Sequence, residues 1–360
     1  MYSIKKSYGL DFIRVIASLL VFIPHIIINF SNNLVIVNNA YLTSIIGVEI
    51  FFCLSGYLIC RQGMFIVNSK KNYIKNTLIF IIRRILRTWP TYFFALLCYA
   101  IFYKFFEKQI AYYLFFIQNL FYPMVSDTFF AVSWSICVEE LFYFIFPILL
   151  ALIFFFNKKI IRKSTSSNIL IIMTCLLIII ITYIIRDDLI YDDWGPEVRR
   201  VAFLRLDAIA FGGLGYFFLY FLNRYKYLNI TLIIISFVSI TVSYYCLKKY
   251  IIESDFQTSN FLNNYIFYYF YIFSICIINL SDKLVKISKK YLQNILSELA
   301  YWSYPLYLMH ILIIDLIKSL QLDNLLLNIV IIIIINFLCA FFIRKYIELP
   351  FIKIRPNFLK

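Results

Sequence analysis

The sequence has little charge and very little histidine, and its cysteines form no metal-binding pattern. Charged residues make up 15% of the 360 positions, and only two residues are histidine. The eight cysteines are scattered through apolar stretches without a CxxC pair, which argues against a zinc ribbon and indicates small core residues. Two distant histidines and scattered acids likewise match no ligand spacing, so we expect no metal site.

Apolar residues are abundant instead, at 63% of the chain, with a mean hydropathy of +0.84. A membrane-spanning helix needs about 20 consecutive apolar residues, and the polar stretches between the apolar runs are too short for a soluble domain. The first apolar run continues without a small-residue cleavage site, so we expect it to be retained as a span. The sequence predicts an all-α polytopic membrane protein in which residues 1–360 form a single membrane domain.

Hydropathy predicts about ten transmembrane helices. The apolar stretch 110–123 is shorter than a crossing and fits an interfacial or re-entrant segment better. The predicted spans are residues 8–28, 41–61, 88–106, 134–156, 168–185, 201–222, 228–247, 261–281, 295–318 and 324–346.

Basic residues are distributed unevenly between the two sides of these spans. One side, which includes both chain ends, holds 24 lysines and arginines, and the other side holds 8. The positive-inside rule then places both termini in the cytoplasm. The net charge of +15 is interpreted as a collar beside anionic lipid headgroups, so we expect no nucleic acid as a partner.

Ionisable residues recur at similar depth in five predicted spans. With a rise of about 1.5 Å per residue, both histidines lie near the outer membrane face and the other five groups lie roughly 7 to 12 Å below it. Such a layer implies a polar cavity, because lipid-facing positions do not tolerate these groups. The layer consists of His25, Glu49, Glu139, Glu140, Arg205, Asp207 and His310.

Two further features concern arginines. Arg14 and His25 are eleven residues apart, about 20° from three full helical turns, so they share a stripe on which Asp11 can pair with Arg14. Arg84 and Arg87 are one turn apart before the third predicted span. Their guanidinium groups suit phosphate or pyrophosphate oxygens, although arginines at this position also anchor the inner end of a span.

Seven short motifs, taken in chain order, resemble those of the acyltransferase-3 family. Members of this family are integral-membrane enzymes that acylate surface carbohydrates. The chain departs from many relatives at Glu49, where Asp is common, and at Pro305, where Ser is usual. Some members carry an additional hydrolase-like domain, and this chain resembles the stand-alone form, since it ends about 14 residues after its last predicted span. The motifs are LDFIR at 10–14 followed by His25, GVEIFFCLSGYLI at 47–59, Arg84-x-x-Arg87, WSICVEELFY at 134–143, RLDA at 205–208, SYPLYLMH at 303–310 and ELP at 348–350.

The resemblance implies transfer of an acyl group, usually acetyl, from cytoplasmic acyl-CoA to a carbohydrate hydroxyl beyond the membrane. Acetyl-CoA would be a donor substrate rather than a bound cofactor, and the partners would be acyl-CoA, the carbohydrate acceptor and membrane lipids. A multi-pass protein of the bacterial inner membrane is the expected setting. The acceptor glycan, the acyl chain length and the oligomeric state stay open.

The same resemblance suggests roles for the residues named above. His25 is the expected catalyst, as nucleophile or general base, and Glu139, or next Glu140, would orient it. Arg14 would stabilise the CoA arm or the thioester oxygen, and Arg84 and Arg87 would bind the CoA phosphates. The remaining candidates, which would contact the acceptor or complete the polar layer, are His310, Glu49, Arg205 and Asp207.

Two other functions are compatible with buried polar groups. A transporter or flippase would bind and move a sugar or lipid-linked glycan without covalent chemistry. A purely structural component of a polysaccharide export assembly is the third possibility. A phosphate-binding arginine pair combined with a buried histidine favours the enzyme, because a transporter needs no CoA site.

Overall fold

The computed structural model describes residues 7–69, 72–121, 129–157, 167–187, 194–222, 228–253, 260–285 and 289–359. Most of these residues are helical, and no strand occurs among them, which confirms the all-α prediction. Several charges used to predict the orientation lie outside the described residues, including Lys5, Lys6, Lys70, Lys71 and Lys158. The cytoplasmic placement of both termini therefore stays a prediction.

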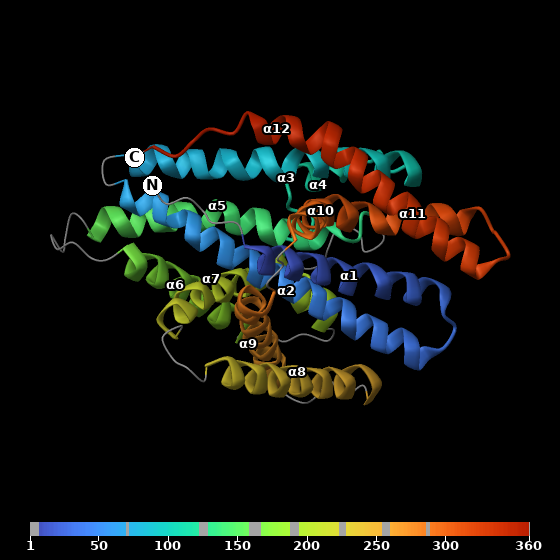
Figure 1. Ribbon diagram of the computed structural model, residues 1–360, viewed down its shortest axis with the longest axis horizontal. Helices are drawn as coiled ribbons and strands as arrows, with labels where there is room; N and C mark the ends of the chain where they lie inside the picture. The colour runs from blue at the N-terminus through green and yellow to red at the C-terminus, as the bar shows by residue number, and fades with distance from the viewer. Residues whose placement is uncertain are drawn as a thin grey trace. The chain divides into compact units, whose positions relative to one another are not determined.

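The elements follow one another along the chain as shown in Figure 1. They are α1 (Tyr8–Phe30), α2 (Leu34–Asn68), α3 (Tyr73–Tyr103), α4 (Ile110–Leu114), α5 (Ser133–Phe156), α6 (Ser167–Asp187), the π-helix η2 (Gly195–Arg199), the 3-10 helix η3 (Ala202–Arg205), α7 (Leu206–Leu222), α8 (Leu228–Glu253), α9 (Asn260–Leu284), α10 (Lys290–Ser319), α11 (Leu325–Ile343), the π-helix η4 (Arg344–Glu348) and α12 (Leu349–Lys353).

A helix occupies each of the ten predicted spans. In the described part of the chain, seven helices are long and apolar enough to cross a membrane, while α8 and α9 contain shorter apolar stretches, Ile230–Cys246 and Tyr265–Ser281. The stretch from residue 110 forms only the five-residue helix α4, in keeping with the prediction that it does not cross. The protein is thus a polytopic helical membrane protein, and the count of ten crossings stays a prediction.

Local sequence signals explain several helix ends. The Ser7 side chain accepts a hydrogen bond from the Leu10 amide at the start of α1, and Asn324 accepts one from Leu327 at the start of α11. Helix α3 ends at Tyr103, and the next residue, Lys104, has a φ of 54° and donates its amide to the Ala100 carbonyl. At its other end, α3 begins at Tyr73 rather than near residue 88, so all three arginines at positions 83, 84 and 87 lie inside the helix.

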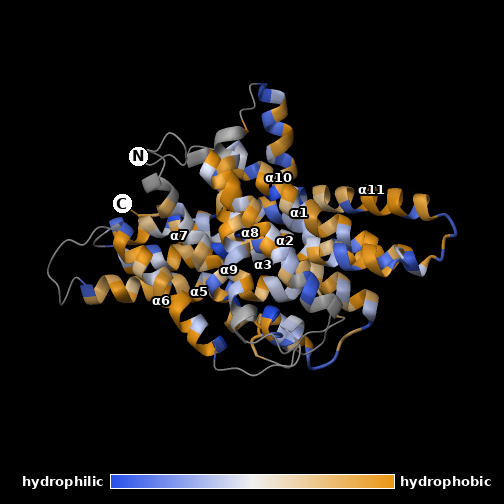
Figure 2. Cartoon of the chain, turned by 90° about the horizontal axis from the view of Figure 1, so that it is seen from below, coloured by the Kyte–Doolittle hydropathy of each residue, from blue (hydrophilic) through white to orange (hydrophobic). Residues whose placement is uncertain are grey.

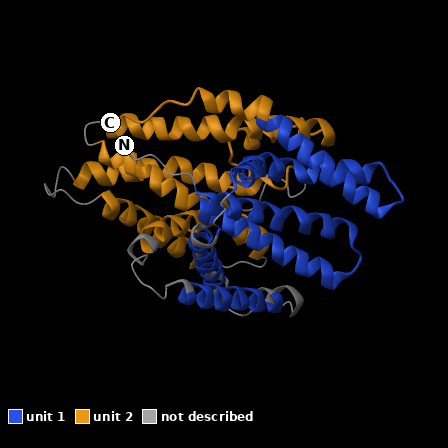
Figure 3. Cartoon of the chain, viewed as in Figure 1, with its two compact units in different colours: residues 1–54, 222–257, 265–344 blue, residues 55–221, 258–264, 345–360 orange. Residues whose placement is uncertain are grey.

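The described contacts divide the chain into two compact units, each assembled from separate segments (Figure 3). Unit 1 comprises residues 1–54, 222–257 and 265–344, and unit 2 comprises residues 55–221, 258–264 and 345–360. Helix α2 contributes its first part to unit 1 and its second part to unit 2. That residues 1–360 form a single membrane domain stays a prediction.

In unit 1, α10 packs against both α1 and α11. The first part of α2 approaches α1 closely at Gly47, where a Cβ atom would lie 2.8 Å from Val21 Cγ2 and 2.9 Å from the Ala17 carbonyl oxygen. A side chain has no room there. Gly47 therefore allows α1 and α2 to approach closely at Val21, which lies one helical turn before His25.

In unit 2, α3 and α6 each pack against α5, and α12 packs against α3. The second part of α2 lies against α7 at Gly56, where an added Cβ atom would overlap the Ile209 carbonyl. A side chain at Gly56 would therefore force the two helices apart.

Large apolar side chains cover the exposed surfaces of several helices. Figure 2 shows hydrophobic residues along the whole length of α11, and Leu326 on this helix is 71% exposed. On α8, Phe237 is exposed to a similar degree. Exposed apolar side chains are unfavourable in water but favourable in contact with lipid chains, so these faces suit a membrane environment.

Candidate functional site

The two histidines meet in unit 1. His25 on α1 and His310 on α10 have ring centroids 4.9 Å apart and an interplanar angle of 65°. Phe22 and Tyr307 flank His310, at 6.2 Å and 5.8 Å between ring centroids. His310 is fully buried, and its Nε2 has no hydrogen-bond partner among the described residues. Helix packing thus creates a pair of imidazoles from positions 285 residues apart in the chain.

Hydrogen bonds indicate the tautomer of both rings. His25 Nδ1 lies 2.7 Å from the Val21 carbonyl oxygen, and His310 Nδ1 lies 2.6 Å from that of Tyr307. A carbonyl only accepts, so each Nδ1 must carry the hydrogen. In the neutral rings Nε2 then holds the lone pair, which is the form that a general base or a nucleophile requires.

Arg14 lies toward the other end of α1, bound to an acid. Its Nη1 atom is 3.4 Å from Asp11 Oδ1, and Ser297 Oγ on α10 donates to Asp11 Oδ2 at 3.0 Å. The predicted pairing of Asp11 with Arg14 is confirmed. Eleven residues at about 1.5 Å each separate Arg14 from His25 along the axis by roughly 16 Å, so one helix joins the two groups across much of a bilayer.

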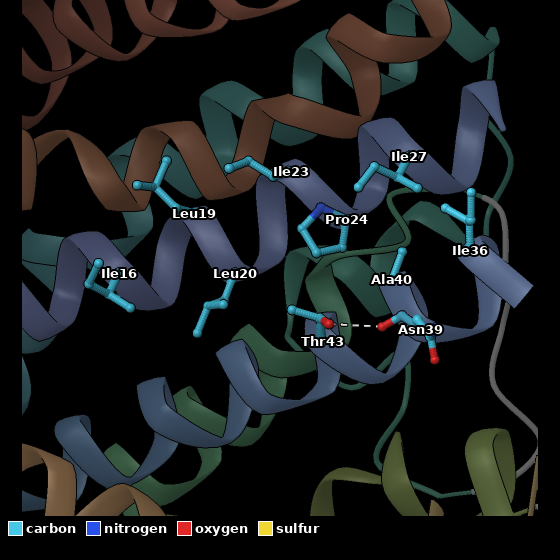
Figure 4. Close-up of a pocket in the computed structure, with 10 residues that line it drawn as sticks. All are labelled: Ile16, Leu19, Leu20, Ile23, Pro24, Ile27, Ile36, Asn39, Ala40 and Thr43. Carbon is cyan, nitrogen blue, oxygen red and sulfur yellow. Dashed lines mark hydrogen bonds between the residues drawn. The ribbon is translucent and has the colours of Figure 1, made fainter. Parts of the chain in front are cut away.

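Two more features of unit 1 bear on the site. Glu49 on α2 is fully buried, as expected of the polar layer. A cavity of about 400 Å³ lies between α1 and the first part of α2 (Figure 4). Its walls are apolar except for Asn39 and Thr43, whose hydroxyl donates to the Asn39 carbonyl at 2.8 Å. Neither histidine lines this cavity, which therefore offers space for hydrocarbon rather than for proton transfer.

Glu139 and Glu140 on α5 are held by different helices of unit 2. Glu139 accepts hydrogen bonds from Ser55 Oγ on α2 at 2.8 Å and from Tyr143 Oη at 2.6 Å. Glu140 accepts from Thr88 Oγ1 at 2.5 Å and from Trp89 Nε1 at 2.9 Å, both on α3. The two carboxylates diverge, as adjacent helical positions should. Glu139 belongs to unit 2 and His25 to unit 1, so their partnership stays a prediction.

Arg84 lies one turn before Thr88 on α3 and is 7% exposed. Its guanidinium stacks over Phe80 and Tyr143 at 5.5 Å and 5.3 Å from the ring centroids, and its Nε and Nη2 atoms have no hydrogen-bond partner among the described residues. Charges on Arg87, Glu139 and Glu140 act on it. A buried guanidinium with donors to spare can bind an anion.

A second cavity, of about 410 Å³, lies beside Glu140 in unit 2. Glu140 and Trp89 provide its polar wall, and the remaining lining is apolar: Phe93, Leu114, Phe115, Phe116, Ile117, Leu120, Leu141 and Phe144. The last residue of α4 and the turn after it supply half of this lining. The short segment that does not cross the membrane thus shapes a cavity next to a carboxylate.

Arg205 and Asp207, two further candidates, are fully buried. Asp207 Oδ2 accepts from Arg186 Nη2 at 2.9 Å, and Arg186 Nη1 also donates to the Leu204 carbonyl at 3.1 Å. Arg186 lies just beyond the predicted span 168–185, and the structure shows it as a buried ion-pair partner in the last turn of α6. The pair ties α6 to the start of α7, and a role of Arg205 or Asp207 toward an acceptor stays a prediction.

The structure therefore assembles the candidates into separate groups: the histidines in unit 1, Arg84 with both glutamates in unit 2, and Asp207 with Arg186. Sequence reasoning missed the side chains that hold the carboxylates, namely Ser55, Thr88, Trp89 and Tyr143. The spacing of four residues between Glu139 and Tyr143 was visible and predicts a shared helix face. The contacts of Ser55 and Trp89 depend on other helices and gave no such signal.

A pair of imidazoles, together with buried carboxylates and guanidiniums, lies within apolar helices of a membrane protein. Ionisable groups in such positions mark a functional site. A family model described as an acyltransferase domain matches residues 7–345. The chain belongs to the acyltransferase-3 family, and it is a membrane acyltransferase. No match is found among curated proteins or among solved structures.

Proposed function

We propose that this acyltransferase moves an acetyl group from cytoplasmic acetyl-CoA to a hydroxyl of a cell-surface or lipid-linked carbohydrate in the bacterial inner membrane. The imidazole pair carries this proposal, because the two rings lie 4.9 Å apart between centroids and their Nδ1 hydrogen bonds leave an Nε2 lone pair on each neutral ring. An alcohol has a pKa far above neutrality, so its attack on a thioester benefits from a base at this position.

As general base, His25 takes the proton of the acceptor hydroxyl through Nε2 while the hydroxyl oxygen bonds to the thioester carbonyl carbon. The carbon–sulfur bond then breaks, and the departing CoA thiolate receives the proton from the imidazolium. As nucleophile, Nε2 first bonds to the carbonyl carbon and expels the thiolate, which gives an acyl-imidazolium. The hydroxyl oxygen then attacks the same carbon, the carbon–nitrogen bond breaks, and the hydroxyl proton neutralises the thiolate. Both routes have the same products, CoA and the acylated carbohydrate.

The donor would be bound through its phosphates. Arg84 is buried with unused donors, and Arg87 follows one turn later on α3. Arg14, held by Asp11 in unit 1, would serve the pantetheine arm or the thioester oxygen. Glu139 and Glu140 would support the charged imidazole or the acceptor, with Glu49, Arg205, Asp207 and His310 in the polar layer.

Transport without covalent chemistry is the alternative function. No observation in the described residues favours it, and membership of an acyltransferase family argues against it. A transporter would leave acetyl-CoA intact, so thioester consumption separates the two functions.

The test uses sealed inner-membrane vesicles with the cytoplasmic face outward, supplied with acetyl-CoA labelled in the acetyl group. Label should enter extractable glycan in vesicles with the wild-type protein and not in vesicles with an equal amount of His25→Gln. Unchanged incorporation in the variant would disprove the role of His25. An absence of thioester consumption by wild-type vesicles with every glycan tested would disprove the proposed donor and reaction.

A further inference from the structure

The segment after α12 folds back along α3 in unit 2 (Figure 1). Asn76 on α3 exchanges two hydrogen bonds with Leu359, accepting its amide at 2.7 Å and donating to its carbonyl at 2.8 Å. Arg83 Nη1 donates to the Pro356 carbonyl at 2.6 Å. Asn76 is fully buried, so these contacts form a specific attachment and not a chance surface contact.

Aromatic contacts strengthen this attachment. Phe358 stacks on Phe65 of α2, with ring centroids 4.9 Å apart and an interplanar angle of 2°. The Arg83 guanidinium also lies over the Phe358 ring, 5.2 Å from its centroid. Arg83 is therefore committed to holding residues 356–358, which leaves its neighbours Arg84 and Arg87 for another task.

Arg355 is brought to α3 by this attachment. Its Nε and Nη2 atoms are buried, and they have no hydrogen-bond partner in the part of the chain that the structure describes. Arg84 on α3 has two donor nitrogens in the same condition. Buried guanidinium donors without acceptors are costly, so two such groups in one unit suggest a ligand that supplies acceptors.

The electrostatics of Arg355 agree with this geometry. Burial first, and then the positive charges of Arg87, Arg84 and Arg83, lower the pKa of Arg355 to about 9, while Glu348 raises it. The group is still protonated at neutral pH, since its pKa lies above 7. Several like charges are thus held together at a free-energy cost that a bound anion would offset.

We propose that Arg355 joins Arg84 and Arg87 in binding the phosphate groups of the acyl-CoA donor, with Asn76 and Arg83 positioning the segment that carries it. The assignment rests on the proposed function, which supplies a donor bearing several phosphates. Guanidinium groups bind phosphate through paired hydrogen bonds, and a set of three can contact more than one phosphate. A phospholipid headgroup offers the same chemistry, so the experiment must separate the two sources.

The experiment measures binding of CoA and of pantetheine, which lacks the phosphates, to the purified full-length protein in an uncharged detergent. Arg355→Gln should weaken CoA binding about tenfold or more, because it removes hydrogen bonds to a charged group. Pantetheine binding should stay unchanged. Lys353→Gln is the matched control, since it removes one positive charge from an exposed position two residues away.

A second set of measurements keeps folding apart from binding. Without ligand, Arg355→Gln should melt no lower than wild type, because it removes a repelled charge, but CoA should raise its melting temperature less. Arg355→Lys should recover only part of the affinity. Asn76→Ala, which loosens the segment, should raise KM for the acyl donor with kcat unchanged.

The possible outcomes lead to different conclusions. Wild-type affinity for CoA in Arg355→Gln would overturn the assignment while leaving the proposed function in place. Failure of the wild-type protein to bind CoA at all would overturn both. If Arg355→Gln instead lost retention of phosphatidylglycerol in mixed micelles with CoA affinity intact, the arginine would serve a lipid headgroup and the donor assignment would be wrong.

Discussion

The histidine pair of unit 1 differs from the arginine and glutamate group of unit 2 in how its side chains are held. His25 and His310 bond to main-chain carbonyls of their own helices, Val21 and Tyr307, so each helix fixes its own tautomer. The carboxylates of Glu139 and Glu140 depend instead on side chains, several from other helices. Local hydrogen bonds suit a neutral ring that exchanges a proton, whereas charged groups need partners from several helices to offset burial.

This comparison predicts that substitutions in the two groups affect different constants. Removing a histidine should slow the chemical step, and removing an arginine should weaken donor binding. Changes to helix packing or to a single carboxylate partner should have smaller effects on activity.

The largest effect is expected from His25→Gln. Loss of a general base or nucleophile should lower the rate of acyl transfer about a thousandfold, because general acid–base catalysis contributes on the order of 10² to 10⁴. CoA binding should stay close to wild type. A rapid-quench experiment without acceptor, followed by mass spectrometry, should find an acylated His25 only if this residue is the nucleophile. Weaker CoA binding with unchanged turnover would reverse the roles assigned to the two groups.

Arg84→Gln should weaken CoA binding by roughly 10- to 100-fold, since it removes charge-assisted hydrogen bonds to phosphate. Turnover at saturating donor should be largely retained, as measured by initial rates over a range of acetyl-CoA concentrations. Lys75→Gln is the matched control, because Lys75 is an exposed cation on the same helix. An equal loss in both variants would indicate a general charge effect and not a site.

Gly56→Ala should destabilise unit 2 by about 1 to 3 kcal/mol, the usual range for overpacking. The added Cβ atom meets the Ile209 main chain, which cannot rotate away. Gly63→Ala provides the comparison, because its Cβ atom would meet only side chains of Leu150 and Phe146, at 3.2 Å. Thermal unfolding in detergent should separate the two variants, and equal melting temperatures would contradict the packing argument.

Ser55→Ala should have the smallest effect, a loss of about 1 kcal/mol or a few-fold in rate. Glu139 would keep its hydrogen bond from Tyr143, so the double variant Ser55→Ala with Tyr143→Phe should lose more than the two single changes combined. Steady-state rates of all three variants measure this coupling. Simple additivity would mean that the two donors support Glu139 independently.

Sequence alone determined the helical class, the family resemblance and the pairing of Asp11 with Arg14. These properties follow from short-range rules: apolar runs of spanning length, and residues three or four apart on one helix face. The start of α3 was missed by many residues because its arginines lower the hydropathy of a segment that is nevertheless helical.

Tertiary structure alone decided which distant residues meet. The contact of His25 with His310, the hydrogen bond from Ser55 to Glu139 and the approach of Arg355 to α3 join positions far apart in the chain. Composition and periodicity describe one helix at a time, so they contain no information on which face of which helix lies opposite. Gly47 and Gly56 show the physical reason. Two helix faces meet at these glycines because main-chain atoms approach to van der Waals distance. Such an approach is a property of the packed pair of helices, and neither sequence segment specifies it alone.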